Sequence, residues 1–185
     1  PYSIYQSVVN NSIIYIEFAD KLDVATALDV DNYRISGGEI EDIKLINNNI
    51  NGATIQITMV KGSIKVNGKY TMRISGIKGF NGSYSEMDEY TANINLVENT
   101  DPQLKSIVYD ATSMDTIKLV FTENITGTMT VRLQERDTGY IIDNTLTVSG
   151  DTVSIKMGRV PADGTHVVIY VLDNRIVDVN GNEST

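Results

Sequence analysis

Side chains able to do acid–base or metal chemistry are few in this chain of 185 residues, and most of them are carboxylates. There is no cysteine, which excludes thiolate nucleophiles, disulfides and cysteine-based zinc sites. The single histidine, His166, stands at the start of a predicted strand, in the inward register, so a structural role is expected for it. No Gly-x-Ser-x-Gly elbow, glycine-rich phosphate loop or His-Glu-x-x-His motif occurs. We therefore predict no catalytic residues and no enzyme activity.

Two acidic places have the oxygen-rich composition that calcium prefers, since Ca²⁺ takes about six to eight oxygen ligands. The first is Asp-Val-Asn-Gly-Asn at 178–182, with Asp173 shortly before it. Its glycine comes one position too early for an EF-hand loop, so a Gly/Asn turn before a final strand is the favoured interpretation. The second is Glu98 with Asp101, where a cation could lock two modules together, although a solvated linker is favoured. We assign no metal ligands, and calcium is the one cofactor that the sequence leaves open.

The charge and the aromatic content bear on the partners. A net charge of −9 without a basic stripe excludes nucleic acid, because a duplex binder must neutralise phosphates. No apolar run approaches the roughly 18–20 residues that span a bilayer. Sugar binding by β-sandwiches relies on flat exposed aromatics, and the chain has no Trp and three Phe. The tyrosines outside the predicted inward stripes are Tyr84, Tyr90, Tyr109 and Tyr140, but single surface tyrosines are common.

The sequence segments that would form the elements positioning these side chains occur twice along the chain. Four stretches of the first half return in the second half in the same order: residues 12–18 as 115–121, 52–59 as 150–157, 67–70 as 163–166, and 80–83 as 179–182. The offsets between the copies are 103, 98, 96 and 99 residues. Offsets that nearly agree indicate two copies of one domain rather than a solenoid, whose repeats are about 20–50 residues long.

In both copies apolar and polar residues alternate, which places neighbouring side chains on opposite faces of a strand. The predicted inward sets are Ile14/Ile16/Phe18, Ile55/Ile57/Met59 and Tyr70/Met72/Ile74 in the first copy, and Ile117/Leu119/Phe121, Val153/Ile155/Met157 and His166/Val168/Tyr170 in the second. Between the stripes stand pairs suited to tight turns: Gly37-Gly38, Asn51-Gly52, Asn67-Gly68, Asn81-Gly82, Asp163-Gly164 and Asn180-Gly181.

Short strands with one solvated face and regular turns are typical of antiparallel β-sandwiches. We therefore predict an all-β protein with two sandwich domains, residues 1–97 and 103–185, joined by a short linker at 98–102. One helical insert is predicted in the first domain near 23–28, where Asp23 can cap it, and the second copy lacks this insert. Pro102 disfavours helix at Asp101, so the linker should be extended and the pair should form a rod with limited bending.

Several of these segments resemble bacterial Ig-like modules of S-layer and other cell-surface proteins. The resemblance lies in residues 18–22, 27–38 and 68–77 of the first copy, and in 121–125, 164–167 and 176–182 of the second. It implies two tandem immunoglobulin-like antiparallel β-sandwiches in an extracellular protein of the bacterial cell surface or cell wall. It also implies a structural or spacer role, often in long arrays, with no catalytic residues to carry over. The first copy departs from the pattern at 79–83, where the Asp and the final Asn are missing.

From these observations we expect a non-catalytic structural or spacer segment of a bacterial surface-layer or cell-wall-associated protein. Its role would be lattice assembly or the presentation of other domains, with neighbouring domains or copies of the same protein as partners. Two alternatives stay open. One is an adhesin or carbohydrate-binding accessory segment that meets cell-wall glycan or a host protein, and the other is a noncatalytic appendage of a secreted hydrolase.

Overall fold

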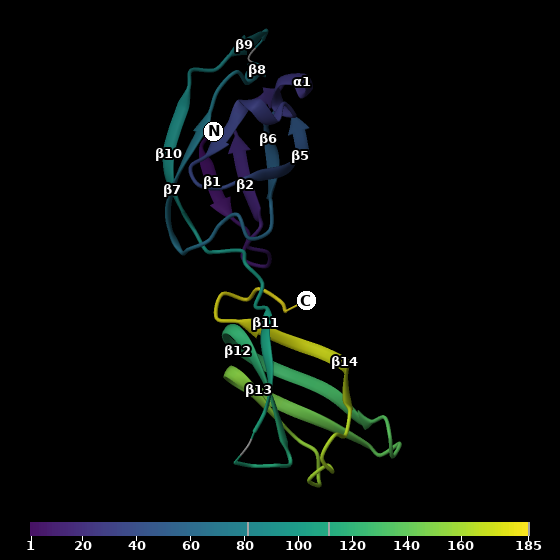
Figure 1. Cartoon of the computed structure of the whole chain (residues 1–185). Helices are drawn as coiled ribbons and strands as arrows, with labels where there is room; N and C mark the ends of the chain where they lie inside the picture. The colour runs from purple at the N-terminus through teal and green to yellow at the C-terminus, as the bar shows by residue number, and fades with distance from the viewer. Residues whose placement is uncertain (81, 111, 185) are drawn as a thin grey trace. The chain divides into compact units, whose positions relative to one another are not determined.

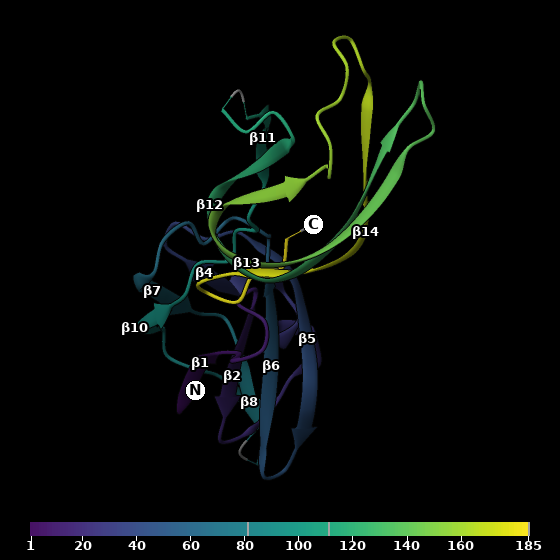
Figure 2. The ribbon, with the colours of Figure 1, turned by 90° about the horizontal axis from the view of Figure 1, so that it is seen from below.

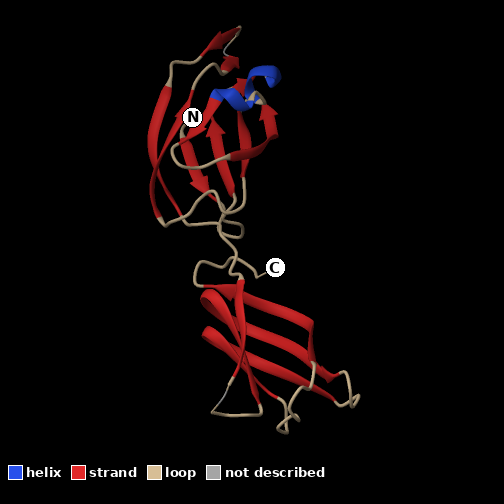
Figure 3. Ribbon diagram, viewed as in Figure 1, coloured by secondary structure: helices blue, strands red, loops and turns tan. Residues whose placement is uncertain are grey.

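The computed structural model describes residues 1–80, 82–110 and 112–184 and is all-β, with several antiparallel sheets and very little helix (Figure 3). The chain divides into two compact units, Pro1–Thr100 and Asp101–Thr185. The predicted turn at Asn81-Gly82 includes Asn81, which lies outside the described residues. The all-β class predicted from the alternation is confirmed.

The first unit is built from short strands (Figure 1). They are β1 (Ser3–Gln6), β2 (Ile13–Phe18), β3 (Lys21–Leu22), β4 (Tyr33–Ile35), β5 (Ile40–Asn49), β6 (Gly52–Met59), β7 (Gly68–Ile74), β8 (Lys78–Phe80), β9 (Tyr84–Glu86) and β10 (Tyr90–Leu96). One sheet has the order β1-β2-β6-β5, a second has the order β10-β7-β4, and β3-β8-β9 form a small third sheet. The first two sheets together supply most of one apolar core.

That core contains all three stripes predicted for the first copy. Ile14, Ile16, Ile55 and Ile57 are fully buried on the adjacent strands β2 and β6. Burying an aliphatic side chain stabilises a fold by about 1.5–3 kcal/mol before entropy is counted, so this alternation determines which face of each strand points inward.

The predicted insert is confirmed as helix α1 (Val24–Ala27), which is followed by the 3₁₀ turn η1 (Val30–Asn32). Asp23 is the N-cap, and its carboxylate accepts a hydrogen bond from the Thr26 amide at 3.0 Å. Tyr33, 1% exposed, donates its hydroxyl to the carbonyl of Ala27 at 2.8 Å. Burial raises the pKa of the Tyr33 phenol, so the hydroxyl keeps the proton that it donates.

The second unit is a single sheet of longer strands: β11 (Leu104–Tyr109), β12 (Thr116–Glu135), β13 (Ile141–Lys156) and β14 (Val167–Asp178). β12 pairs with β11 in its first part and with β14 in its second part, and β13 runs beside it throughout. The change of partner coincides with a register shift between Val120 and Ile125. Figure 2 shows β12 and β13 bending along their length, as bulged strands do. The bent sheet forms a separate apolar core, which includes the stripes predicted for β12 and β13.

The register predicted for the third stripe of the second copy is wrong. His166 is exposed, with 79% of its side chain accessible, and Tyr170 is exposed as well. Instead, Val167 and Ile169 pack against the core, one residue out of step with the prediction. A register shift opposite Thr130 and Val131 changes the inward-facing set of β14 again. Further along the strand, Ile176 is therefore buried. Because the side-chain period of a strand is two, a bulge exchanges its inward and outward residues.

The linker predicted at 98–102 is divided between the two units. Asn99 belongs to the first unit: its side chain accepts a hydrogen bond from the Ile64 amide at 2.9 Å and donates one to the Val60 carbonyl at 3.1 Å. In the second unit the Gln103 amide donates to the Thr122 hydroxyl at 3.0 Å. The solvated linker expected for Glu98 and Asp101 is wrong, because both side chains are buried.

Candidate functional site

The closing turn of the second unit contains the acidic segment 178–182. Asp178, 2% exposed, ends β14, and its Oδ1 accepts hydrogen bonds from the amides of Asn180 and Asn182, both at 2.8 Å. Its Oδ2 accepts a third from the Asn182 side chain at 2.8 Å. Gly181 has a φ of 86°, a conformation that glycine adopts without strain. The Asp178 carboxylate therefore organises the turn that the sequence predicted, whereas Asp173 lies in the exposed part of β14 and pairs with Arg175 at 3.0 Å.

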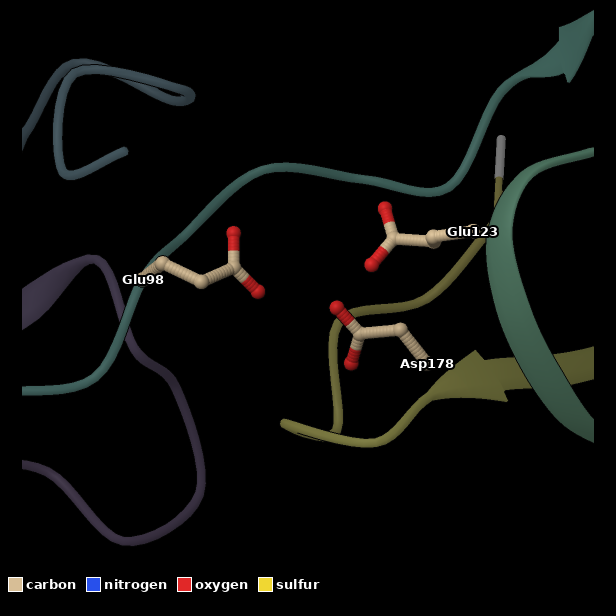
Figure 4. A group of neighbouring side chains, drawn as sticks. All are labelled: Glu98, Glu123 and Asp178. Atoms are coloured by element: carbon tan, nitrogen blue, oxygen red, sulfur yellow. The ribbon is translucent and has the colours of Figure 1, made fainter. Parts of the chain in front are cut away.

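Within the same unit, Glu123 faces Asp178. A carboxylate oxygen of each lies within 4.8 Å of the other (Figure 4). Glu123 stands in the register shift of β12, and nearby Ile125 pairs with Asp178 across the β12–β14 ladder. Carboxylate oxygens are among the ligands that Ca²⁺ prefers in proteins. The sequence analysis missed Glu123, because residues 123 and 178 become neighbours only when β12 pairs with β14.

Glu98, also drawn in Figure 4, is placed by contacts inside the first unit. Its amide donates to the Asn67 side chain at 2.8 Å, and its carboxylate accepts from the Thr100 amide at 2.8 Å. Asp101 begins the second unit and is also buried. Calcium binding by either acidic segment, which the sequence left open, is tested by melting curves with and without a chelator.

A second ionic cluster surrounds Glu135 at the end of β12. The Arg159 guanidinium donates to both oxygens of this buried carboxylate, and the Thr138 hydroxyl donates to one of them. These hydrogen bonds, those of Arg159 foremost, lower the pKa of Glu135. The same guanidinium lies 4.2 Å from the ring centroid of Tyr140, a cation–π contact. Glu135 and Arg159 are thus paired with each other at the end of the β12–β13 hairpin.

The remaining candidate residues are dispersed. His166 precedes β14 and lies 3.8 Å from the Asp137 carboxylate, with no serine or second carboxylate in contact with it among the described residues. Tyr84 and Tyr109 are exposed, whereas Tyr90 packs partly against the first core. Tyr84 lies beside the exposed ring of Phe80 on the neighbouring strand β8, with the ring centroids 5.0 Å apart.

Comparisons with known proteins give a weak structural similarity. No protein family matches the sequence, and no curated protein matches it. Among solved structures the chain is similar to the crystal structure of the N-terminal part of the bacterial S-layer protein SbsC, with a TM-score of 0.38 and 15% sequence identity. The match covers 89% of this chain and 43% of that chain, so this chain spans less than half of the structure it matches. A TM-score this low supports no argument about function.

In the part of the chain that the structure describes, no helix has the length and apolar character needed to cross a membrane.

Proposed function

We propose that this chain is a non-catalytic structural or spacer segment of a bacterial surface-layer or cell-wall-associated protein, outside the cell. In this proposal both units are immunoglobulin-like sandwiches that take part in lattice assembly or hold other domains in place. A spacer must resist extension, and the observation that carries the proposal is the way in which the first unit ties its first strand to its last strand.

The tie is the side chain of Gln6 at the end of β1. Its Nε2 donates to the Val97 carbonyl at 2.8 Å, and the Val97 amide donates to its Oε1 at 2.7 Å. Gln6 thus forms hydrogen bonds with both the amide and the carbonyl of Val97, the residue that follows β10. The C-terminal ends of β1 and β10 meet there, so the two strands run in the same direction, and they contact each other.

This arrangement determines how a pulling force would act on the first unit. The force would reach β1 from its N-terminal end and β10 from its C-terminal end, and the two strands would have to slide past each other. Sliding loads the hydrogen bonds of a strand together, whereas peeling breaks them one after another. After Val97, the side chain of Asn99 forms hydrogen bonds with the backbone of Ile64 and Val60. The first unit is therefore held by hydrogen bonds almost to its last residue, Thr100.

Force spectroscopy on the whole chain, tethered at its two ends, tests the proposal. We expect Gln6→Ala to unfold the first unit about tenfold faster under constant force, because two hydrogen bonds are together worth about 1–3 kcal/mol. Gln56→Ala is the matched control, since Gln56 lies on β6 away from the tie, and its unfolding rate should match that of the unsubstituted chain.

Equal unfolding rates for the chain and Gln6→Ala would show that the load does not pass through this contact, and the spacer proposal would then lose its support. Specific binding on a glycan array would favour the adhesin alternative instead.

A further inference from the structure

The longest strand of the first unit, β5, lies at the edge of its sheet (Figure 2). The other edge strands of the two main sheets are β1, β10 and β4. β1 and β10 contact each other, and β4 has only 3 residues. β5 has 10 residues, and among the described residues no strand pairs with it on the side away from β6. The longest edge of this unit therefore has amide and carbonyl groups available to another strand.

Only the middle of β5 is accessible for regular pairing. At its start Ile40 packs partly against the core. Near its end the Asn48 side chain accepts a hydrogen bond from the Leu22 amide at 2.8 Å and donates one to the Leu22 carbonyl at 3.0 Å. Register shifts on either side leave residues 42–45 as the regular stretch. Because bulges shorten the edge that another strand can use, a partner on this edge would bind weakly.

The regular stretch has a charged face and a core face. Ile43 is 9% exposed and points into the core. Asp42 and Lys44 lie on the opposite face, and their side chains are 49% and 63% exposed. Within one chain the Lys44 Nζ lies 3.4 Å from the Asp42 Oδ2. An exposed pair of this kind adds little to folding stability, so the fold alone does not require these two charges.

The segment 42–44 is complementary to itself in one antiparallel register. Residues directly opposite each other on neighbouring strands share a face, so positions paired about a two-fold axis differ by an even number. With the axis at Ile43, Asp42 of each copy lies opposite Lys44 of the other copy, and two ion pairs form. An axis at Asp42 or at Lys44 would place like charges opposite each other, which destabilises strand pairing.

We propose that two copies of this chain associate through their β5 strands, antiparallel and about a two-fold axis at Ile43. The sheet β1-β2-β6-β5 would then continue from one copy into the other. Backbone hydrogen bonds at the edge give affinity, and the two ion pairs between Asp42 and Lys44 fix the register. The occupant is a second copy because the charges on this edge match their own sequence in reverse. Since it names a contact for lattice assembly, the proposal rests on the assembly role stated above.

Sedimentation of the whole chain, at about 0.15 M salt and from about 10 µM to 1 mM protein, measures the association. Salt at this level screens much of the repulsion between copies that each have a net charge of −9. We expect a dissociation constant of about 100 µM, in keeping with a short edge. Amide exchange at residues 41–45 should slow as the dimer forms, because the edge amides become hydrogen-bonded.

Charge reversal tests the register directly. Asp42→Lys and Lys44→Asp each place like charges opposite each other at both contacts, and each should weaken self-association at least about tenfold. An equimolar mixture of the two variants restores unlike charges at both contacts. The mixture should therefore associate within about threefold of the affinity of the unsubstituted chain. This rescue also shows that both variants are folded.

Net charge is controlled by a variant elsewhere on the same unit. Lys69→Asp on β7 changes the net charge as Lys44→Asp does, and Lys69 is exposed away from β5. Its self-association should stay within about twofold of that of the unsubstituted chain. Asp42→Lys makes the chain less acidic, so repulsion governed by net charge alone would predict tighter association for this variant.

Three results would overturn the proposal. The first is a monomer at about 1 mM protein. The second is a mixture of Asp42→Lys and Lys44→Asp that fails to associate. The third is equal weakening by Lys44→Asp and Lys69→Asp, because net charge would then govern the association. The force experiment on Gln6→Ala reads single molecules and a different pair of strands, so its outcome is separate from this one.

Discussion

The two units contain related sequences and solve the problem of covering a core in different ways. The first closes its core between separate sheets, and β10 completes the edge beside β7. The second bends one sheet around its core, and among the described residues no strand pairs with residues 167–172 of β14 on the edge away from β12. Ile4 faces Ile16, and Ile107 faces Leu119 at the equivalent position. Ile4 is half-buried, whereas Ile107 is exposed. A shared pattern of apolar stripes therefore fixes which residues can form a core, and strand pairing decides how completely those residues are covered.

The largest effect should come from β10, the strand that completes the edge beside β7 in the first unit. Leu96 on β10 is 2% exposed, and Leu96→Ala should lower the free energy of unfolding of the first unit by about 2–5 kcal/mol, because it leaves a cavity. Ile107→Ala is the comparison in the second unit, and it should change stability by less than about 0.5–1 kcal/mol at its exposed position. Native-state hydrogen exchange resolves each unit separately. Similar losses in both would contradict the difference in coverage.

An intermediate effect is expected at one turn position that the two copies share. Gly52 and Gly150 are equivalent and have φ angles of 135° and 110°. A Cβ on Gly52 would lie 2.5 Å from the Phe18 carbonyl oxygen, whereas one on Gly150 would meet nothing within 4 Å. Both alanine variants carry backbone strain of about 1–3 kcal/mol, but Gly52→Ala must also displace backbone. We expect Gly52→Ala to be the more destabilising in thermal unfolding, and equal melting temperatures would show that the close approach relaxes freely.

The smallest effect is the loss of folding stability at acidic pH. In the second unit hydrogen bonds from Lys118, Lys156, Arg159 and Arg132 lower the pKa values of their carboxyl partners, which are Asp110, Asp115, Glu135 and Asp143 respectively. In the first unit Arg73 does the same for Glu89. A carboxyl whose pKa is lower in the folded state contributes stability that is present above its unfolded pKa, about 4, and is lost as the pH falls through the folded value.

Acidification from about pH 6 to pH 3 should therefore destabilise the second unit more than the first. Hydrogen exchange measured across this range gives the slope for each unit. Salt at about 1 M is the control, because exposed ion pairs are screened and the two slopes should converge. A steeper loss in the first unit would contradict the assignment of these ion pairs.

Prediction from the sequence succeeded where the cause is local. The alternation around Ile16 and Ile155 identified buried faces, and Asp23 before an alanine-rich turn identified the helix with its cap. It failed at His166, because the bulge that shifts β14 arises from pairing with β12 and leaves no mark in the spacing. Of the acidic residues, Asp178 was recognised from its turn, whereas Glu123 was found only through strand pairing.

The sequence by itself determined that this protein is all-β, that similar apolar stripes and turns recur in its second half, and which residues those stripes contain. These properties follow from side-chain period and turn chemistry, which act over a few residues. Tertiary structure alone decided the hydrogen bonds between Gln6 and Val97, the burial of Glu98 and Asp101, and the approach of Glu123 to Asp178. Each of these depends on which strands become neighbours, and strand pairing joins residues far apart in the chain that no local pattern relates.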